Sequence, residues 1–354
     1  MKNKIAIASA FLAATSFSMG EIVVNEFLSF EGFVDSSYSH TNSDQDAGGQ
    51  ESDNSFQVDQ VEISWMFDFD VVTAQIDLEY EDLDGAKADD YDDEVEQAFV
   101  NYALGNGDVI TAGRYASMLG FEAFEPTGLY QYSTAYTIND VSGVSGGLLD
   151  NTGFQAVSEY AQGVKFTRTS DTTFFGISLQ DQSFGNNGGR LGGDRVGADN
   201  GDSSYAVEVA YSIDLGNGFN LFAGAAFEDA DSGDNELFNV YATYETGAWL
   251  FAAELNIGEN ESETGADDDT DLTSGLVMAN YAYSDVASVT ARISMVEIEQ
   301  DTLDYDFIKY TVAHNYALAD NLLLVTEISV GDLEDTAGND YDVTELAVEL
   351  LFSF

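Results

Sequence analysis

The sequence predicts an all-β fold: a closed antiparallel transmembrane β-barrel of about 16 strands, with short periplasmic turns and long extracellular loops. Three observations support this. Segments in which apolar and polar residues alternate recur along the chain. The connections between them alternate between long and short. The chain ends on a strand-like run, where Leu346, Val348, Leu350, Phe352 and Phe354 fall on one side of a two-residue repeat.

The amino terminus has the layout of a secretory signal peptide. Lys2 and Lys4 precede an apolar stretch, residues 5–14, and small residues follow as far as Gly20. The expected organisation is therefore a signal peptide at 1–20 and a barrel at 21–354. The apolar stretch is shorter than the ~18 residues that a spanning helix needs, so a chain that enters a membrane would do so as strands.

The charge balance is strongly acidic, with 65 Asp and Glu against 10 Lys and Arg and a formal net charge of -55. Such a surface repels nucleic acid, which is excluded as a partner. The hydrophobic content of 44% is ample to order the chain, so the acidic residues must belong to a folded protein and not to a disordered one. The chain has no Cys, which removes disulfides and thiolate metal sites. No cofactor is expected.

The amino-terminal strands are the clearest. Residues 56–69 carry an apolar row that includes Val61 and Trp65, and a turn at Asp70 leads into the next row, which ends at Tyr80. Short turns such as Gly105-Asn106-Gly107 alternate with polar connections such as 40–55 and an acidic loop near residues 89–93. The expected strands of this part are 25–39, 56–69, 72–80, 95–104 and one that ends near residue 115.

The pattern resumes after a long connection, residues 116–158. Short turns at 169–171, 214–218, 245–247, 284–285 and 319–320 again alternate with longer connections. The expected strands are 159–168, 172–180, 203–213, 219–228, 237–245, 248–258, 273–284, 287–298, 305–317, 321–330 and 341–354. An even number of strands can close on itself, which removes exposed edges.

Aromatic residues near the strand ends are expected to form the girdles that mark the membrane interfaces, because amphipathic rings favour that position. They are Tyr80, Tyr102, Tyr115, Tyr244, Trp249, Tyr281 and Tyr283.

The connection 116–158 differs from the other loops because it is rich in apolar and aromatic residues. A loop of this length and composition should fold against protein rather than extend into solvent. We expect an inward-folded third loop that constricts the pore. The alternative is an outer lid or a subunit contact.

The start of this connection resembles the corresponding region of the OmpL-like outer-membrane β-barrel porins of Gram-negative bacteria. The resemblance lies in Gly113-Arg114-Tyr115, Leu119-Gly120-Phe121-Glu122, Glu125-Pro126 and Tyr132-Ser133-Thr134-Ala135-Tyr136. It implies a location in the bacterial cell outer membrane and a water-filled channel for passive diffusion of small hydrophilic solutes and ions. It supplies no catalytic residues. The alternative function is a non-conducting, plugged barrel that acts as an adhesin or structural anchor.

Partners follow from this resemblance. They are outer-membrane lipid and lipopolysaccharide, the permeating solutes and ions, and the barrel assembly machinery, whose signal the terminal Phe354 resembles. A homotrimer is expected by analogy with barrels of this size.

Charged residues opposite the apolar rows should face the lumen, because a charge that faces lipid is costly. The expected lumen acids are Glu62, Asp77, Glu79, Glu208, Glu254, Glu327, Glu345 and Glu349. Acids outnumber bases, so a preference for cations is expected. A sharper hypothesis is a transverse field, with basic residues on one wall and loop acids opposite them; simple lumen salt bridges are the alternative. The candidate constriction residues are Arg114, Lys165, Arg292 and Lys309, opposed by Glu122 and Glu125.

The sequence also contains residues suited to calcium binding and to hydrolysis. The acidic stretches 229–236 and 267–271 offer hard oxygen ligands, but neither matches the full calcium loop, and a solvated surface suited to high salt is the favoured interpretation. No metal site is assigned. His314 lies on the outward row, but its expected neighbours include no Ser nucleophile, so no enzyme is expected.

Overall fold

The computed structural model describes residues 20–45, 49–81, 93–122, 125–137, 160–181, 204–230, 233–262, 269–300, 304–335 and 340–354. Most of the expected signal peptide lies outside these ranges. Among the described residues, no helix has the length and apolar character that would let it cross a membrane.

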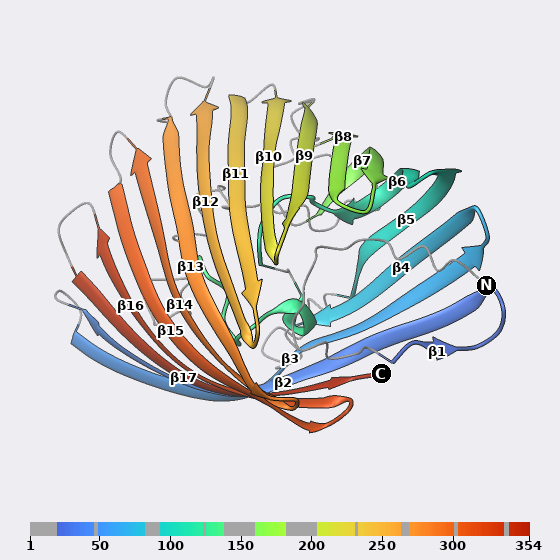
Figure 1. Ribbon diagram of the computed structural model, residues 1–354. Coiled ribbons are helices and arrows are strands. Elements are labelled where there is room, and N and C mark those ends of the chain that lie inside the picture. Colours follow the sequence, from blue (N-terminus) through green and yellow to red (C-terminus); the bar gives the residue numbers. More distant parts are fainter. Residues whose placement is uncertain are drawn as a thin grey trace.

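The described chain is almost entirely β-structure (Figure 1), with one short 3-10 helix. The strands are β1 (Ile22–Val23), β2 (Leu28–Gln45), β3 (Gly49–Phe69), β4 (Val72–Glu81), β5 (Asp93–Gly105), β6 (Asp108–Ala116), β7 (Tyr160–Thr169), β8 (Thr173–Gln180), β9 (Ser204–Gly216), β10 (Phe219–Ala230), β11 (Gly233–Thr246), β12 (Trp249–Ser262), β13 (Thr270–Ser284), β14 (Ala287–Gln300), β15 (Asp304–Ala319), β16 (Leu322–Asp335) and β17 (Asp340–Ser353). The helix, η1 (Pro126–Gly128), lies between β6 and β7.

The sheet closes on itself. Each strand from β2 to β17 pairs antiparallel with the next, and β17 pairs with β2. The short β1 is an additional strand that pairs with β2. The predicted closed antiparallel barrel of 16 strands is therefore confirmed. Closure matters energetically because every strand of the ring has two hydrogen-bonded neighbours, so no edge is left unpaired.

The last residue takes part in this closure. Phe354 and Gly32 exchange two main-chain hydrogen bonds, each 2.9 Å between nitrogen and oxygen. The Phe354 ring lies 5.8 Å from that of Phe352 and 6.3 Å from that of Phe30. Gly32 has no space for a side chain, since a Cβ would collide with the Glu62 carbonyl oxygen and the Phe354 ring. The terminal aromatic residue thus completes the seam between β17 and β2.

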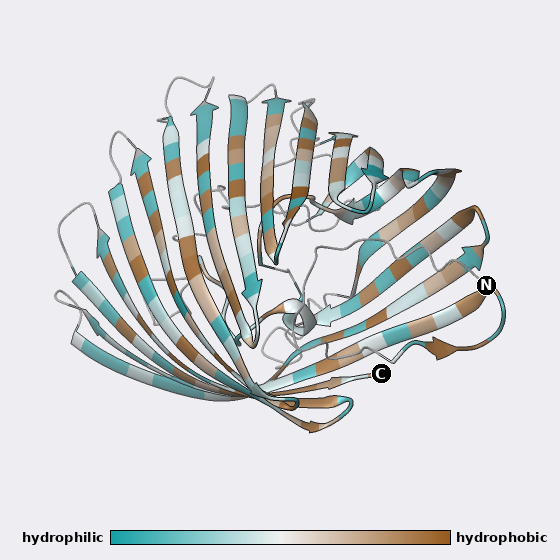
Figure 2. Cartoon of the chain, viewed as in Figure 1, coloured by the Kyte–Doolittle hydropathy of each residue, from teal (hydrophilic) through white to brown (hydrophobic). Residues whose placement is uncertain are grey.

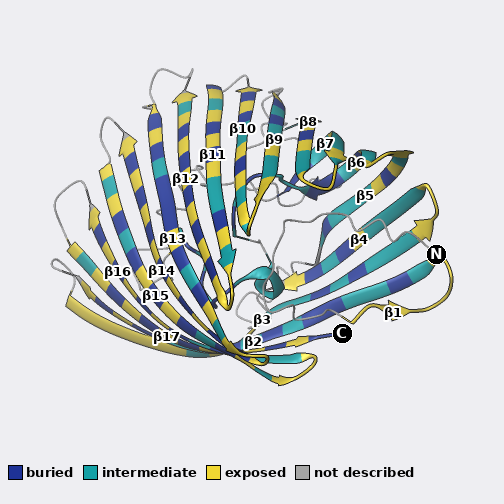
Figure 3. Cartoon of the chain, in the orientation of Figure 1, coloured by how far each residue is buried: buried dark blue, intermediate teal, exposed yellow. Residues whose placement is uncertain are grey.

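Along the strands, many apolar side chains are exposed and many polar side chains are buried, which is the reverse of the arrangement in a soluble protein. Along β17, Leu346, Val348 and Leu350 are exposed, whereas Glu345 and Glu349 are buried. The same stripes of hydropathy and burial run along the other strands (Figures 2 and 3). An exposed apolar face and a buried polar face suit a wall with hydrocarbon outside and water or polar protein groups inside.

Tight turns join the strands at the end of the barrel that carries both termini. The pairs Asn106-Gly107 and Asn217-Gly218 each have two consecutive positive φ values, 57° and 83° in the first and 56° and 82° in the second. Two such residues give a type I′ turn, whose twist matches that of the paired strands. The predicted short turns at these positions reflect this backbone requirement.

At the opposite end the strands run further than the sequence pattern indicates. The expected connection 40–55 is wrong: β2 continues to Gln45 and β3 begins at Gly49. A strand of 21 residues, the length of β3, is about twice the 9–11 residues that cross a bilayer. The acidic stretch 229–236 likewise contributes to a hairpin in which Asp229 pairs with Asp234. Polar strand extensions lack an apolar row, which is why the pattern underestimates them.

Most of the expected girdle aromatics are exposed, as an interface position requires; they are Tyr80, Tyr102, Tyr244, Trp249, Tyr281 and Tyr283. Tyr115 is the exception, and its assignment to the girdle is wrong. Its side chain is only 2% exposed, and the Lys165 ammonium lies 4.2 Å from its ring centroid.

Candidate functional site

The segment that follows β6 lies inside the ring of strands (Figure 1), and its described residues, 117–122 and 125–137, are called the inward loop below. It bonds the buried faces of β9, β12, β14, β15 and β16, which lie in different parts of the wall. These contacts place the inward loop against the inner face of the barrel. The remainder of the expected connection, 138–158, is outside the described residues.

Three of the expected lumen acids bind the inward loop through its main chain. Glu208 of β9 accepts hydrogen bonds from the Met118 N–H at 2.7 Å and the Ser117 hydroxyl at 2.6 Å. Glu254 of β12 accepts from the Phe121 N–H at 2.7 Å. A carboxylate that accepts from a main-chain N–H satisfies a donor that would otherwise be buried without a partner.

Glu327 of β16 makes the densest of these contacts. One of its oxygens accepts from the N–H groups of Tyr132 and Ser133, at 2.9 and 3.1 Å, and the other accepts from the Ser133 hydroxyl at 2.6 Å. Glu208, Glu254 and Glu327 therefore do more than line the wall, since they bond the inward loop to it.

Apolar side chains complete the docking. Phe121, Tyr130 and Ala135 of the inward loop form a buried cluster with Leu250, Ala252, Leu276 and Met278 of β12 and β13. Leu119 packs in a second cluster that contains Phe222 and Leu237. Inward apolar residues are unusual on a polar lumen face. Here the inward apolar residues of the wall lie under the inward loop, so they contact its apolar side chains and not water.

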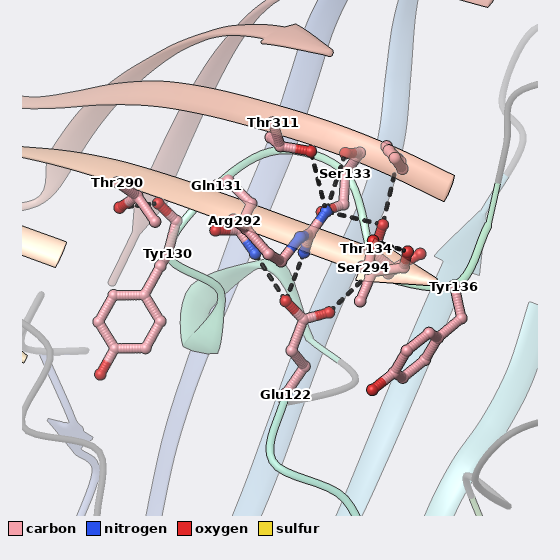
Figure 4. Close-up of polar contacts among 12 residues, drawn as sticks. Glu122, Tyr130, Gln131, Ser133, Thr134, Tyr136, Thr290, Arg292, Ser294 and Thr311 are labelled. Carbon is pink, nitrogen blue, oxygen red and sulfur yellow. Dashed lines mark hydrogen bonds and ion pairs between the residues drawn. The ribbon is translucent and has the colours of Figure 1, made fainter. Parts of the chain in front are cut away.

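Arg292 of β14 is the central cation of the docked loop (Figure 4). Its guanidinium forms an ion pair with Glu122 and donates to the carbonyl oxygens of Ser133 and Thr134, both at 2.9 Å. Glu122 also accepts from the Ala135 N–H at 2.8 Å. Lys309 of β15 donates to the carbonyl oxygens of Thr134 and Thr137, both at 3.1 Å.

The other two basic candidates lie across the barrel. Arg114 of β6 donates from Nε to the Glu96 carbonyl oxygen at 2.6 Å, and its guanidinium lies 5.7 Å from the Tyr160 ring centroid. Lys165 of β7 is half-buried and donates to the Ala116 carbonyl oxygen at 3.2 Å.

The expectation that all four basic residues share one wall is wrong. In a ring of 16 strands, β14 and β15 lie eight strands from β6 and β7, so the cations form two pairs on opposite sides. Alternation along a strand fixes which side of the wall a residue faces, but its position around the ring depends on strand number. The two loop acids are divided as well, since Glu122 pairs with Arg292 while Glu125 accepts from Gln60 and Tyr160, both at 2.8 Å.

All eight expected lumen acids are buried, each less than 9% exposed; they are Glu62, Asp77, Glu79, Glu208, Glu254, Glu327, Glu345 and Glu349. Those on β3 and β4 bond wall side chains. Glu62 accepts from Ser64 at 2.6 Å, Asp77 accepts from Gln97 at 2.8 Å, and Glu79 accepts from Gln60.

Sequence reasoning missed Glu96, which is 5% exposed. The register between β4 and β5 shifts beside it, with Asp77 opposite Gln97 and Leu78 opposite Val95. A bulge inserts an unpaired residue and breaks the two-residue repeat. No signal in the alternation could have found this acid, although its closeness to Glu62 and Glu125 makes it part of the site.

A closed 16-stranded barrel with an apolar exterior, a charged interior and a segment docked inside defines the porin class of bacterial outer-membrane proteins. Residues 28–354 match the model of the family described as putative β-barrel porin-2, OmpL-like, and the chain belongs to this family. The protein is accordingly located in the bacterial outer membrane. None of the curated proteins compared with the chain matches it significantly.

Solved outer-membrane proteins share the fold at low sequence identity. The channel DcaP of Acinetobacter baumannii is 11% identical with a TM-score of 0.65, over 92% of this chain and 97% of that one. An anion-selective porin from Comamonas acidovorans is 15% identical with a TM-score of 0.61, over 92% and 99%. In vitro folded OmpT of Vibrio cholerae, in a trimer form, is 14% identical with a TM-score of 0.56, over 92% and 99%.

Proposed function

We propose that the protein forms a water-filled channel for passive diffusion of small hydrophilic solutes and ions, and that it prefers cations. The observation that carries the preference is an acidic sector of the wall, formed by β17 and β2 to β5. The sequences of these five strands contain no Lys or Arg. Its buried acids are Asp35, Glu62, Asp77, Glu79, Glu96, Glu345 and Glu349.

Little positive charge offsets this sector. Arg114 of the adjacent β6 bonds the Glu96 carbonyl oxygen and brings one positive charge to seven buried acids. Arg292 and Lys309 are buried and already bonded to the inward loop, and both lie on β14 and β15, outside the sector. In a narrow passage, fixed charge of one sign raises the local concentration of counter-ions. A cation that passes along the acidic sector therefore meets a favourable potential, and an anion meets a barrier.

The inward loop sets the constriction in this proposal. Most of its bonds are made to β9, β12 and β14 to β16, while Tyr132 and Glu125 bond Ser37 of β2 and Gln60 of β3. Solutes therefore pass along the part of the acidic sector that the inward loop leaves uncovered. This replaces the transverse field expected from one basic wall. The field instead runs from Arg292 and Lys309 towards the acidic sector.

A plugged barrel that serves as an adhesin or anchor is the second candidate. The dense packing of Phe121 and Tyr130 against the wall favours it, since a docked loop can also close a lumen. The proposal assigns no catalytic role to His314, whose ring lies on the outer side of β15 and bonds the Tyr283 hydroxyl at 2.6 Å. A homotrimer is proposed by analogy with OmpT of Vibrio cholerae, which was solved in a trimer form. Recognition of Phe354 by the assembly machinery and contact with lipopolysaccharide also remain proposals.

Reconstitution in a planar bilayer tests the function. The proposal expects stepwise single-channel currents and, across a potassium chloride gradient, a reversal potential of the sign that cation selectivity gives. Absence of current from correctly folded protein would favour the plugged barrel.

A further inference from the structure

Three carboxylates that are distant in sequence converge inside the barrel. Glu62 comes from β3, Glu96 from β5 and Glu125 from the inward loop. One oxygen of each lies within 4.8 Å of those of the other two. Ca²⁺ binds oxygen at about 2.3–2.6 Å, so two ligands of one ion lie up to about 5 Å apart. The spacing is therefore that of ligands of one ion.

Two oxygens in this cluster lack partners. The Oε2 atoms of Glu62 and Glu96 are buried without a hydrogen bond, in side chains that are each 5% exposed. A buried carboxylate oxygen without a donor carries a large desolvation cost. Arg114, which bonds the Glu96 carbonyl oxygen, brings one positive charge to three carboxylates. The cluster is thus short of positive charge and has ligand positions free.

Glu125 is held in place by the wall. Its carboxylate accepts from the Gln60 amide and from the Tyr160 hydroxyl, both at 2.8 Å. Although Glu125 directly precedes η1, its side chain makes no capping bond to that helix. These contacts orient a loop carboxylate towards two wall carboxylates, and the mutual repulsion of the three is relieved by a bound cation or by protonation.

We propose that Glu62, Glu96 and Glu125 bind one divalent cation, of which Ca²⁺ has the fitting size, and that the ion ties the inward loop to β3 and β5. Carboxylate oxygens are the ligands that hard cations prefer, and Ca²⁺ tolerates irregular geometry, whereas Mg²⁺ requires a near-octahedral one. The ion would complete the docking of the inward loop on the acidic side of the lumen.

Calorimetric titration of calcium chloride tests the proposal. The protein is refolded into detergent without lipopolysaccharide, which binds calcium itself. The expected result is one saturable class of site in the wild type, weakened at least tenfold in both Glu96→Gln and Glu125→Gln. Two matched controls each remove one acid elsewhere: Glu299→Gln on the exposed tip of β14 and Glu349→Gln on the buried face of β17. Both should retain the site.

Equal titrations of the wild type and Glu125→Gln would overturn the site, as would equal losses in the control variants. Tighter binding of magnesium than of calcium would overturn the assignment of the ion. Should Glu96→Gln fail to fold, Glu125→Gln still decides the question, because Glu125 lies on the loop and not in the wall. Calorimetry needs no current, so a failure here is distinct from a failure of the channel function.

Discussion

Arg292 on β14 and Glu122 in the inward loop form an ion pair in the interior of the barrel, and each of them also bonds main-chain atoms of the inward loop. The pair therefore joins the wall to the loop and also fixes the turn at residues 133–135. Removing one partner of a buried pair leaves an uncompensated charge, which typically costs about 3–5 kcal/mol.

Replacement of Arg292 by Met should loosen the inward loop while the barrel remains folded. Glu122 would lose its cation, and the carbonyl oxygens of Ser133 and Thr134 would lose a donor. We expect noisier single-channel currents and faster proteolysis within residues 117–137. The matched control is Arg168→Met, which breaks an exposed ion pair with Asp108 at the turn end. Equal behaviour of the two variants would contradict a docking role for Arg292.

The seam between β17 and β2 should be sensitive to a single added carbon. Gly32→Ala places a Cβ against the Glu62 carbonyl oxygen and the Phe354 ring, so β2 would have to shift and the bonds to Phe354 would weaken. The folded fraction, measured by heat-dependent mobility in gel electrophoresis, should fall relative to the wild type. Ser36→Ala, another small exchange on β2, should leave it unchanged. Normal folding of Gly32→Ala would show that the seam is looser than described.

Two glycines at one turn separate backbone strain from steric collision. Gly105 and Gly107 both have positive φ, at 91° and 83°, but a Cβ at Gly107 would meet the Thr169 carbonyl oxygen whereas one at Gly105 meets nothing within 4 Å. The positive φ alone costs an Ala about 1–2 kcal/mol. Urea unfolding should therefore show Gly107→Ala to be less stable than Gly105→Ala. If Gly105→Ala were instead the less stable variant, the close contact with the Thr169 carbonyl oxygen would not limit the side chain at position 107.

How far the sequence predicts this structure depends on the regularity of each strand. The two-residue repeat placed Lys309 and Glu349 on the buried face because their strands pair without a register shift over those residues. The repeat is interrupted near Arg114. This residue pairs with Ala98, which shares a row with the exposed Val100, yet Arg114 itself is only 4% exposed. The preceding Gly113 has φ 134°, so the alternation is interrupted there.

Other features depend on distances that a sequence does not contain. The contacts of Glu327 with residues 132 and 133 span nearly 200 positions, and the convergence of Glu62, Glu96 and Glu125 depends on how the inward loop docks. Composition did indicate that this loop would pack against protein, because its aromatic residues need apolar contacts. Which wall residues receive it could not be predicted.

The most direct test of the central claim, an acidic sector that favours cations, is the reversal potential across a potassium chloride gradient for the wild type and for Glu345→Gln/Glu349→Gln. The control is Glu261→Gln/Glu299→Gln, which removes the same charge from exposed strand tips. A cation-selective wild type whose reversal potential moves towards zero only when the buried pair is neutralised is the predicted result. An anion-selective wild type, or an equal shift in the control, would contradict the account.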